Sequence, residues 1–164
     1  MAKADLGGRK MQYQVDPIAQ RTQHTCWEAC GRMMWNWRYR NDLGRLSYYA
    51  NKVAGWTEID RGLDHAGLRA YFKLLGLRTL DRAREYNVRF ALQWTPVVVA
   101  FRGAPADPGH IVVISGFDGR NYTVVNPQGG VNFNTAVKDG WIATTYPENK
   151  SSLDAGIEPF IFYW

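Results

Sequence analysis

The most regular stretch of the chain is residues 20–37, which read QRTQHTCWEACGRMMWNW. From Cys26 onward the apolar residues recur every three or four positions, and they form one stripe at Cys26, Cys30, Met33 and Trp37. This spacing predicts an amphipathic helix over about 26–39. Thr25 and Glu28 stand three residues apart at its start, a pattern typical of a capping box that begins the helix at Cys26.

Further periodic segments follow this helix, and the chain changes character near Pro96. The apolar spacing predicts helices over 46–53, 63–75 and 84–94. After Pro96, short β-branched and aromatic runs predict strands over 97–101, 111–115, 122–125, 132–133 and 160–164, with a turn over 116–119.

Helices followed by antiparallel strands indicate an α+β fold. We expect one domain over residues 1–164, with a helical lobe at about 15–94 and a β lobe at about 95–164. The polar residues 1–14 are expected to be a flexible leader.

Composition limits the class of protein. With 46% apolar and 14% aromatic residues, the 164-residue chain can build a core. No apolar stretch reaches the ~18 residues of a membrane span, so we expect no membrane partner. The first ten residues lack an apolar core, so no secretory signal peptide is expected. Two cysteines cannot form a disulfide scaffold, which favours the cytoplasm or export without a cleavable signal.

The net charge of +5 permits anionic partners. The arginines are spread along the chain in runs of no more than two basic residues, which favours a solvated basic surface. We therefore expect no nucleic-acid partner.

Four residues have the types that thiol chemistry requires. Gln20 lies six residues before Cys26, His110 begins an apolar strand after Gly109, and Asn126 ends the next strand. A helix N-terminus favours a thiolate, and an imidazole can take the thiol proton. A polar side chain can orient that imidazole, and an amide can stabilise an oxyanion.

This arrangement resembles the papain-like cysteine peptidases, on the string Gln20-x5-Cys26-Trp27, then Gly109-His110 and Asn126. The likeness runs from about 15 to 127 and is greatest to small bacterial members: double-glycine leader peptidases and papain-like effector or toxin proteases. It implies a papain-like fold with the active site in the cleft between the two lobes.

The resemblance also implies a role for each residue of the string. Cys26 would be the nucleophile, His110 the base, Asn126 its orienting partner, and Gln20 with the Cys26 N–H the oxyanion hole. Trp27 and His24 would contact a protein or peptide substrate. No cofactor and no metal are expected.

The same resemblance suggests a bacterial effector or toxin that acts in a recipient cytosol, with an immunity or inhibitor protein as a partner. Gly7 and Gly8 resemble a double-glycine processing site, so a preference for small residues before the scissile bond is a hypothesis. A narrow cleft walled by aromatics such as Trp27 would favour glycine there.

Several alternatives stay open on sequence alone. Gln23 competes with Gln20 for the oxyanion, His24 with His110 as the base, and Asp118 with Asn126 as the orienting group. Cys30 is interpreted as a packed free thiol and His65 as structural or exposed. A zinc set of His24, Cys26, Cys30 and His65 fits no usual module.

Other functions also remain. Transglutaminases, deamidases and peptidoglycan amidases use the same chemistry, and a catalytically idle binding module on this scaffold is a rival of another class. A nucleic-acid-binding domain is a third rival, supported only by the net charge. Asn126 lacks the following Ser-Trp of the plant enzymes, so Trp141 is one candidate to cover it.

Overall fold

A computed structural model describes residues 11–101, 110–138, 141–142 and 159–164, with backbone only at 131–138 and 141–142. Four helices fall in this part of the chain: α1 Cys26–Arg38, α2 Leu43–Lys52, α3 His65–Leu74 and α4 Glu85–Ala91. Each lies within three residues of a predicted helix at both ends.

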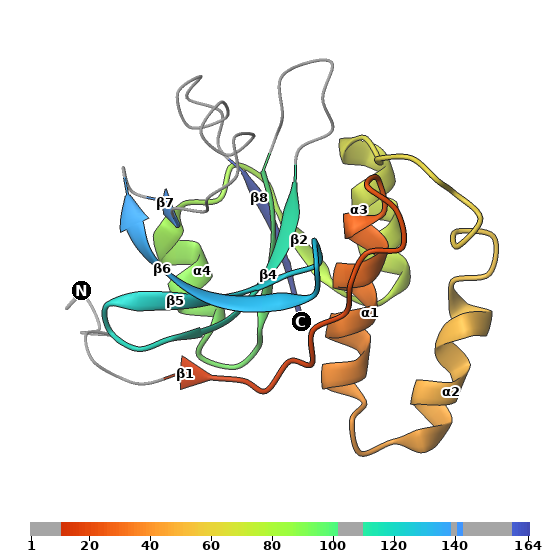
Figure 1. The fold of residues 1–164 in the computed structure, drawn as a ribbon, viewed down its shortest axis with the longest axis horizontal. Coiled ribbons are helices and arrows are strands. Elements are labelled where there is room, and N and C mark those ends of the chain that lie inside the picture. Colours follow the sequence, from red (N-terminus) through yellow and green to blue (C-terminus); the bar gives the residue numbers. More distant parts are fainter. Residues whose placement is uncertain (1–10, 102–109, 139–140, 143–158) are drawn as a thin grey trace.

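The strands follow mostly in the second half, as predicted. They are β1 Met11–Gln12, β2 Arg78–Leu80, β3 Val97–Ala100, β4 Ile111–Phe117, β5 Asn121–Asn126, β6 Val131–Lys138, β7 Trp141–Ile142 and β8 Phe160–Tyr163. They pair antiparallel in the order β2-β8-β3-β4-β5-β6-β7, and β1 pairs with β4 (Figure 1). The fold is therefore α+β, as expected.

The central strands are buried on both faces, which is why they appear in the sequence as continuous apolar runs. Val98 and Ala100 of β3 face a core formed with α1 and α3, whereas Val97 and Val99 face a second core formed with α4. The sheet thus separates α1 to α3 from α4, and α1 packs directly against β4.

A glycine lets α3 approach α1 closely. A Cβ on Gly31 would lie 2.5 Å from the Tyr71 ring, so only glycine fits at this point of α1. The Tyr71 hydroxyl there lies 2.9 Å from the Tyr49 hydroxyl of α2, and this buried pair ties the three helices together.

Two short strands were missed by the sequence reasoning. Met11–Gln12 pair with Gly116 and Phe117, so the predicted leader over 1–14 extends too far along the chain. Arg78–Leu80, inside the predicted helical lobe, pair with β8. Strands of two or three residues are too short to show a period, and only their long-range partners define them.

Two local predictions, the capping box and the turn, were also wrong in detail. Thr25 precedes α1 but makes no side-chain cap, because its hydroxyl accepts the Thr22 N–H at 2.9 Å. Glu28 pairs with Arg21 at 3.1 Å instead of completing a capping box. Strand β4 runs on through Phe117, so the turn is shorter than the predicted 116–119.

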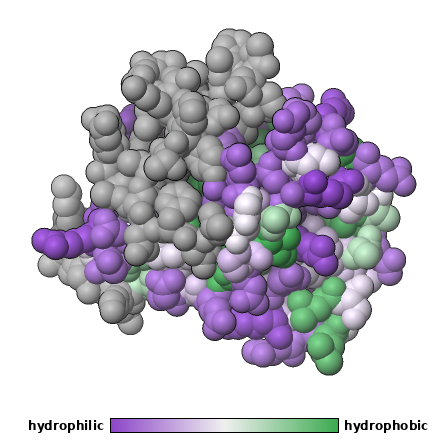
Figure 2. All heavy atoms as spheres, viewed as in Figure 1, coloured by the Kyte–Doolittle hydropathy of each residue, from purple (hydrophilic) through white to green (hydrophobic). Residues whose placement is uncertain are grey.

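The surface is polar over most of the described area in the view of Figure 2, with apolar residues in small separate patches. Among the described helices, none combines the length and the apolar character needed to cross a bilayer.

Candidate active site

Cys26 is the first residue of α1 and is 8% exposed. The N–H groups of a first helical turn have no carbonyl partner within the helix, and they carry its partial positive charge. Thr25 makes no side-chain hydrogen bond to them. The sulfur therefore lies where an anion is favoured.

Cys30, one turn further along α1, fixes the helix against the sheet. Its sulfur donates to the Ile111 carbonyl at 3.5 Å, and the side chain is fully buried. Cys26 precedes Cys30 by one helical turn, and His110 precedes Ile111 by one residue. Cys26 and His110 therefore lie at the same end of the contact between α1 and β4. Figure 1 shows the start of α1 and the start of β4 at one end of the molecule.

His110 and Asn126 are paired. His110 Nε2 lies 3.0 Å from Asn126 Oδ1, and the two side chains are 9% and 5% exposed. The register that pairs Val113 of β4 with Val125 of β5 places Asn126 opposite Val112, so His110, two residues before Val112, is a diagonal neighbour of Asn126. The Gln128 N–H also donates to Asn126 Oδ1 at 3.0 Å and holds the amide in place.

Gln20 comes to the same end through its backbone. Its N–H donates to the Pro127 carbonyl at 2.7 Å, next to Asn126. Its side-chain Nε2 donates to the Thr22 carbonyl at 2.9 Å, and its buried Oε1 has no hydrogen-bond partner in the described structure. Gly130 lies against Ala19, so the β5–β6 turn packs on the segment that carries Gln20.

The two residues predicted to contact a substrate, His24 and Trp27, lie in different surroundings. His24 is exposed beside Gln23, with 3.1 Å between its Nε2 and the Gln23 Nε2. Trp27 is fully buried, packs on Trp56 and Tyr71, and donates its indole N–H to the Arg61 carbonyl at 2.9 Å. The prediction that Trp27 walls a substrate cleft is wrong, because its ring belongs to the helical core.

The other cysteine, acid and histidine considered in the sequence have structural surroundings of their own, outside the His110–Asn126 pair. Burial, and to a smaller degree the nearby Cys26, raises the pKa of the Cys30 thiol well above its ordinary value, as a packed thiol requires. Asp118 accepts the N–H groups of Arg120 and Asn121 in the β4–β5 turn. His65 lies 3.0 Å from Asp81 and stacks on Phe160, a structural position.

Some of the residues singled out in the sequence lie outside the part of the chain that the structure describes. Gly7, Gly8 and Gly109 lie outside the described residues, and so does the side chain of Trp141. Within the described residues, no group of three His, Cys, Asp or Glu side chains is arranged to hold a metal ion.

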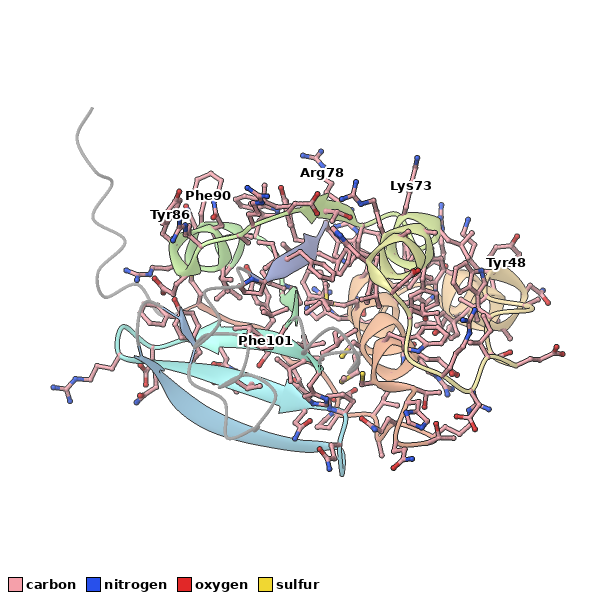
Figure 3. The ribbon with its side chains drawn as sticks, turned by 90° about the horizontal axis from the view of Figure 1, so that it is seen from above. Tyr48, Lys73, Arg78, Tyr86, Phe90 and Phe101 are labelled. Atoms are coloured by element: carbon pink, nitrogen blue, oxygen red, sulfur yellow. The ribbon has the colours of Figure 1, made fainter. Side chains whose placement is uncertain are left out.

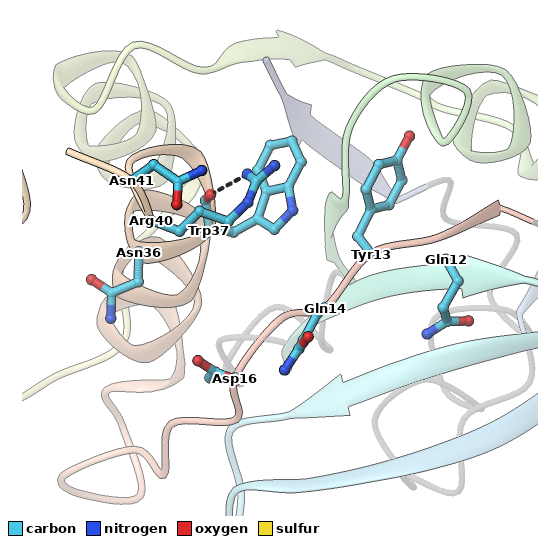
Figure 4. Close-up of a pocket in the computed structure, with 8 residues that line it drawn as sticks. All are labelled: Gln12, Tyr13, Gln14, Asp16, Asn36, Trp37, Arg40 and Asn41. Carbon is cyan, nitrogen blue, oxygen red and sulfur yellow. Dashed lines mark hydrogen bonds between the residues drawn. The ribbon is translucent and has the colours of Figure 1, made fainter.

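A polar pocket of about 480 Å³ lies at the other end of α1. One side is lined by Gln12, Tyr13, Gln14 and Asp16, and the other by Asn36 and Trp37 of α1 with Arg40 and Asn41 just after it (Figure 4). Asn36 is ten residues beyond Cys26, roughly 15 Å along a helix axis. None of the predicted site residues lines this pocket.

Three main-chain groups hold the site together, and none of them was predicted from the sequence. The Pro127 carbonyl, the Gln128 N–H and the Ile111 carbonyl each fix one candidate side chain or its segment. They are main-chain groups, and no residue type marks such a contact in advance.

A comparison with protein families identifies the class of protein. A family model described as papain-like cysteine protease AvrRpt2 matches residues 8–140, which is most of the chain. The chain therefore belongs to this family of papain-like cysteine proteases, and it is a cysteine-type peptidase with an α+β papain-like fold. A search of curated proteins found no significant match.

Proposed function

We propose that the chain hydrolyses peptide bonds of a protein substrate with Cys26, His110, Asn126 and Gln20 as its working residues. The observation that carries this proposal is the buried His110–Asn126 hydrogen bond at the end of the sheet where α1 begins. With Nε2 engaged by Asn126, the imidazole has Nδ1 left for proton transfer with the Cys26 sulfur.

In the first half-reaction, His110 takes the Cys26 proton and the sulfur attacks the peptide carbonyl carbon. The tetrahedral oxyanion is stabilised by the Cys26 N–H and by Gln20. Because an amide nitrogen carries two hydrogens and Thr22 takes one, the Gln20 side chain keeps one to donate. The C–N bond then breaks, and the imidazolium gives its proton to the leaving amine.

In the second half-reaction, water attacks the thioester that remains on Cys26. His110 takes a proton from this water, the C–S bond breaks, and the acid product leaves while the thiol regains its proton. Asn126 neither gains nor loses a proton, and its role is to hold the ring in one tautomer and orientation. No cofactor enters these steps.

The direct test compares two cysteines on the same helix. A cell lysate is incubated with wild type, Cys26→Ala or Cys30→Ala, and cleaved proteins are identified by intact mass. We expect cleavage by wild type and Cys30→Ala and none by Cys26→Ala. Loss of cleavage only in folded Cys30→Ala would reject Cys26 as the nucleophile.

We further propose that the enzyme acts as an effector in a recipient cytosol, with a preference for glycine before the scissile bond. Family membership supports the effector role, and the Gly7–Gly8 pair motivates the glycine preference. The burial of Trp27 removes one predicted wall of the cleft, so the preference now depends on the sequence pair alone. A peptide library cleaved equally well with large residues at that position would reject it.

A further inference from the structure

Three exposed aromatic side chains follow one line along α4 and the residues after it. Tyr86, Phe90 and Trp94 are spaced by four residues and are 65%, 58% and 45% exposed. The Phe90 and Trp94 rings meet edge to face at 5.1 Å, and the Trp94 indole donates to the Trp164 carbonyl at 3.0 Å. These contacts hold the Phe90 and Trp94 rings in place while about half of their area faces outward.

Positive charge is concentrated in the same part of the chain. Residues 69–90 contain six basic and two acidic residues, so this segment accounts for most of the net charge of +5. Both acids are engaged: Asp81 by Arg69 and His65, and Glu85 by Arg89 at 2.7 Å and by Tyr122.

Three exposed cations in this segment have no ion pair to any acidic side chain in the described ranges, and they are Lys73, Arg78 and Arg82. Lys73 belongs to α3, Arg78 to the edge strand β2, and Arg82 to the connection from β2 to α4.

Two of these cations and two of the rings share one side of the molecule, Trp94 contacts Phe90, and Arg82 lies between β2 and α4. In Figure 3, Lys73, Arg78, Tyr86 and Phe90 all point outward along the upper rim, whereas Tyr48 of α2 lies apart from Tyr86 and Phe90. We call Lys73, Arg78, Arg82, Tyr86, Phe90 and Trp94 the basic–aromatic face.

We propose that the basic–aromatic face docks on a membrane surface that contains anionic lipid headgroups. Lysine and arginine side chains are attracted to such a surface, and aromatic rings are stable at the headgroup boundary. The rings of Tyr86 and Phe90 protrude, which suits entry into a headgroup layer better than recognition by an acidic peptide. The expectation of no membrane partner came from the lack of a long apolar stretch, which excludes only a spanning segment, and surface docking requires none.

The test is co-sedimentation of the full chain with vesicles of phosphatidylcholine alone or mixed with phosphatidylserine. We expect binding only to the mixed vesicles, and weaker binding as salt rises. Lys73→Gln/Arg78→Gln/Arg82→Gln should lower the partition coefficient by about 100-fold, at roughly five-fold for each charge removed. Tyr86→Ala/Phe90→Ala should also weaken binding, while the remaining binding stays salt-dependent.

Matched controls are Tyr48→Ala, an exposed aromatic of α2, and Arg32→Gln, an exposed cation of α1. Both should bind like wild type. Circular dichroism checks folding, and Tyr86→Phe/Phe90→Tyr provides an aromatic-preserving variant that should keep binding. The proposal would be overturned if wild type did not bind the mixed vesicles. It would also be overturned if the control variants lost as much binding as the variants of the basic–aromatic face. Binding to soluble polyglutamate or to DNA without vesicle binding would also overturn it and indicate a different anionic partner.

Discussion

Cys26 and Cys30 lie one turn apart on α1, yet their surroundings differ in kind. Cys26 is at the helix N-terminus, at the end of the sheet that carries the His110–Asn126 pair and the Gln20 segment. Cys30 is sealed between the helical core and the sheet, where burial raises its thiol pKa. Position along one helix thus divides two identical side chains into a candidate nucleophile and a packing residue.

The largest expected effect tests the imidazole at the Cys26 end. His110→Ala should lower turnover by several orders of magnitude, nearly as far as Cys26→Ala, because nucleophile and base act as a unit. His24→Ala, the matched control from the loop before α1, should retain most activity. Turnover of one cleavable substrate measures both. An inactive but folded His24→Ala beside an active His110→Ala would assign the base to the wrong histidine.

The second prediction compares the two thiols directly. Limited iodoacetamide at neutral pH should label Cys26 faster than Cys30 by a factor on the order of 10³ or more, since Cys30 requires local unfolding before it reacts. Peptide mass mapping over time measures the two rates, and denaturant should make them converge. Preferential labelling of Cys30 in the folded protein would reverse the comparison.

The third prediction concerns the oxyanion. Gln20→Ala should lower kcat by about 10²–10³ with little change in KM, because this donor acts mainly in the transition state. Gln23→Ala is the control, because Gln23 is exposed three residues further along. If the loss appears in Gln23→Ala instead, the donor has been misassigned.

A smaller effect is expected at the orienting residue. Asn126→Ala leaves the imidazole in place, so we expect a loss of roughly 10-fold to 100-fold, below that of His110→Ala. Asn126→Asp should keep substantial activity, because a carboxylate accepts the same hydrogen bond and stabilises the imidazolium. Steady-state rates of the three proteins decide this, and an inactive, folded Asn126→Asp would contradict the role.

The smallest expected effect is on stability, and it concerns the buried Tyr49–Tyr71 pair. Burial raises the pKa of Tyr49 to about 12, against an ordinary value of 10.0. The folded state therefore holds this proton after the unfolded state has lost it. The contribution to the free energy of unfolding is complete below pH 10 and is lost as the pH rises from about 10 towards 12.

Urea unfolding at neutral and alkaline pH measures this dependence. Tyr49→Phe should lower the free energy of unfolding by about 1 kcal/mol at pH 7, because Tyr71 loses its buried partner. Tyr49→Phe/Tyr71→Phe should show a shallower alkaline decline than wild type, whereas the exposed Tyr48→Phe should change neither. If the free energy of unfolding of the double variant declined with pH as steeply as that of wild type, the pH dependence could not be assigned to this tyrosine pair.

Much of the fold was predictable because its elements are long enough to show a period. The apolar stripe of α1 predicted the helix, Thr25 at its N-cap predicted the first residue, and the apolar runs of β3, β4 and β8 predicted the sheet. Strands β1 and β2 were not predictable, because two or three residues carry no pattern and are defined by their partners β4 and β8.

The candidate site divides in the same way. The sequence by itself determined which residue types could perform thiol chemistry and in what order, since Cys26, His110 and Asn126 stand at helix and strand ends that local patterns reveal, and Gln20 lies six residues before Cys26. Only the tertiary structure decided that His110 and Asn126 meet across β4 and β5, and that Trp27 turns into the core. Those outcomes depend on strand register and on packing between distant segments, which bring together residues that local sequence patterns treat as unrelated.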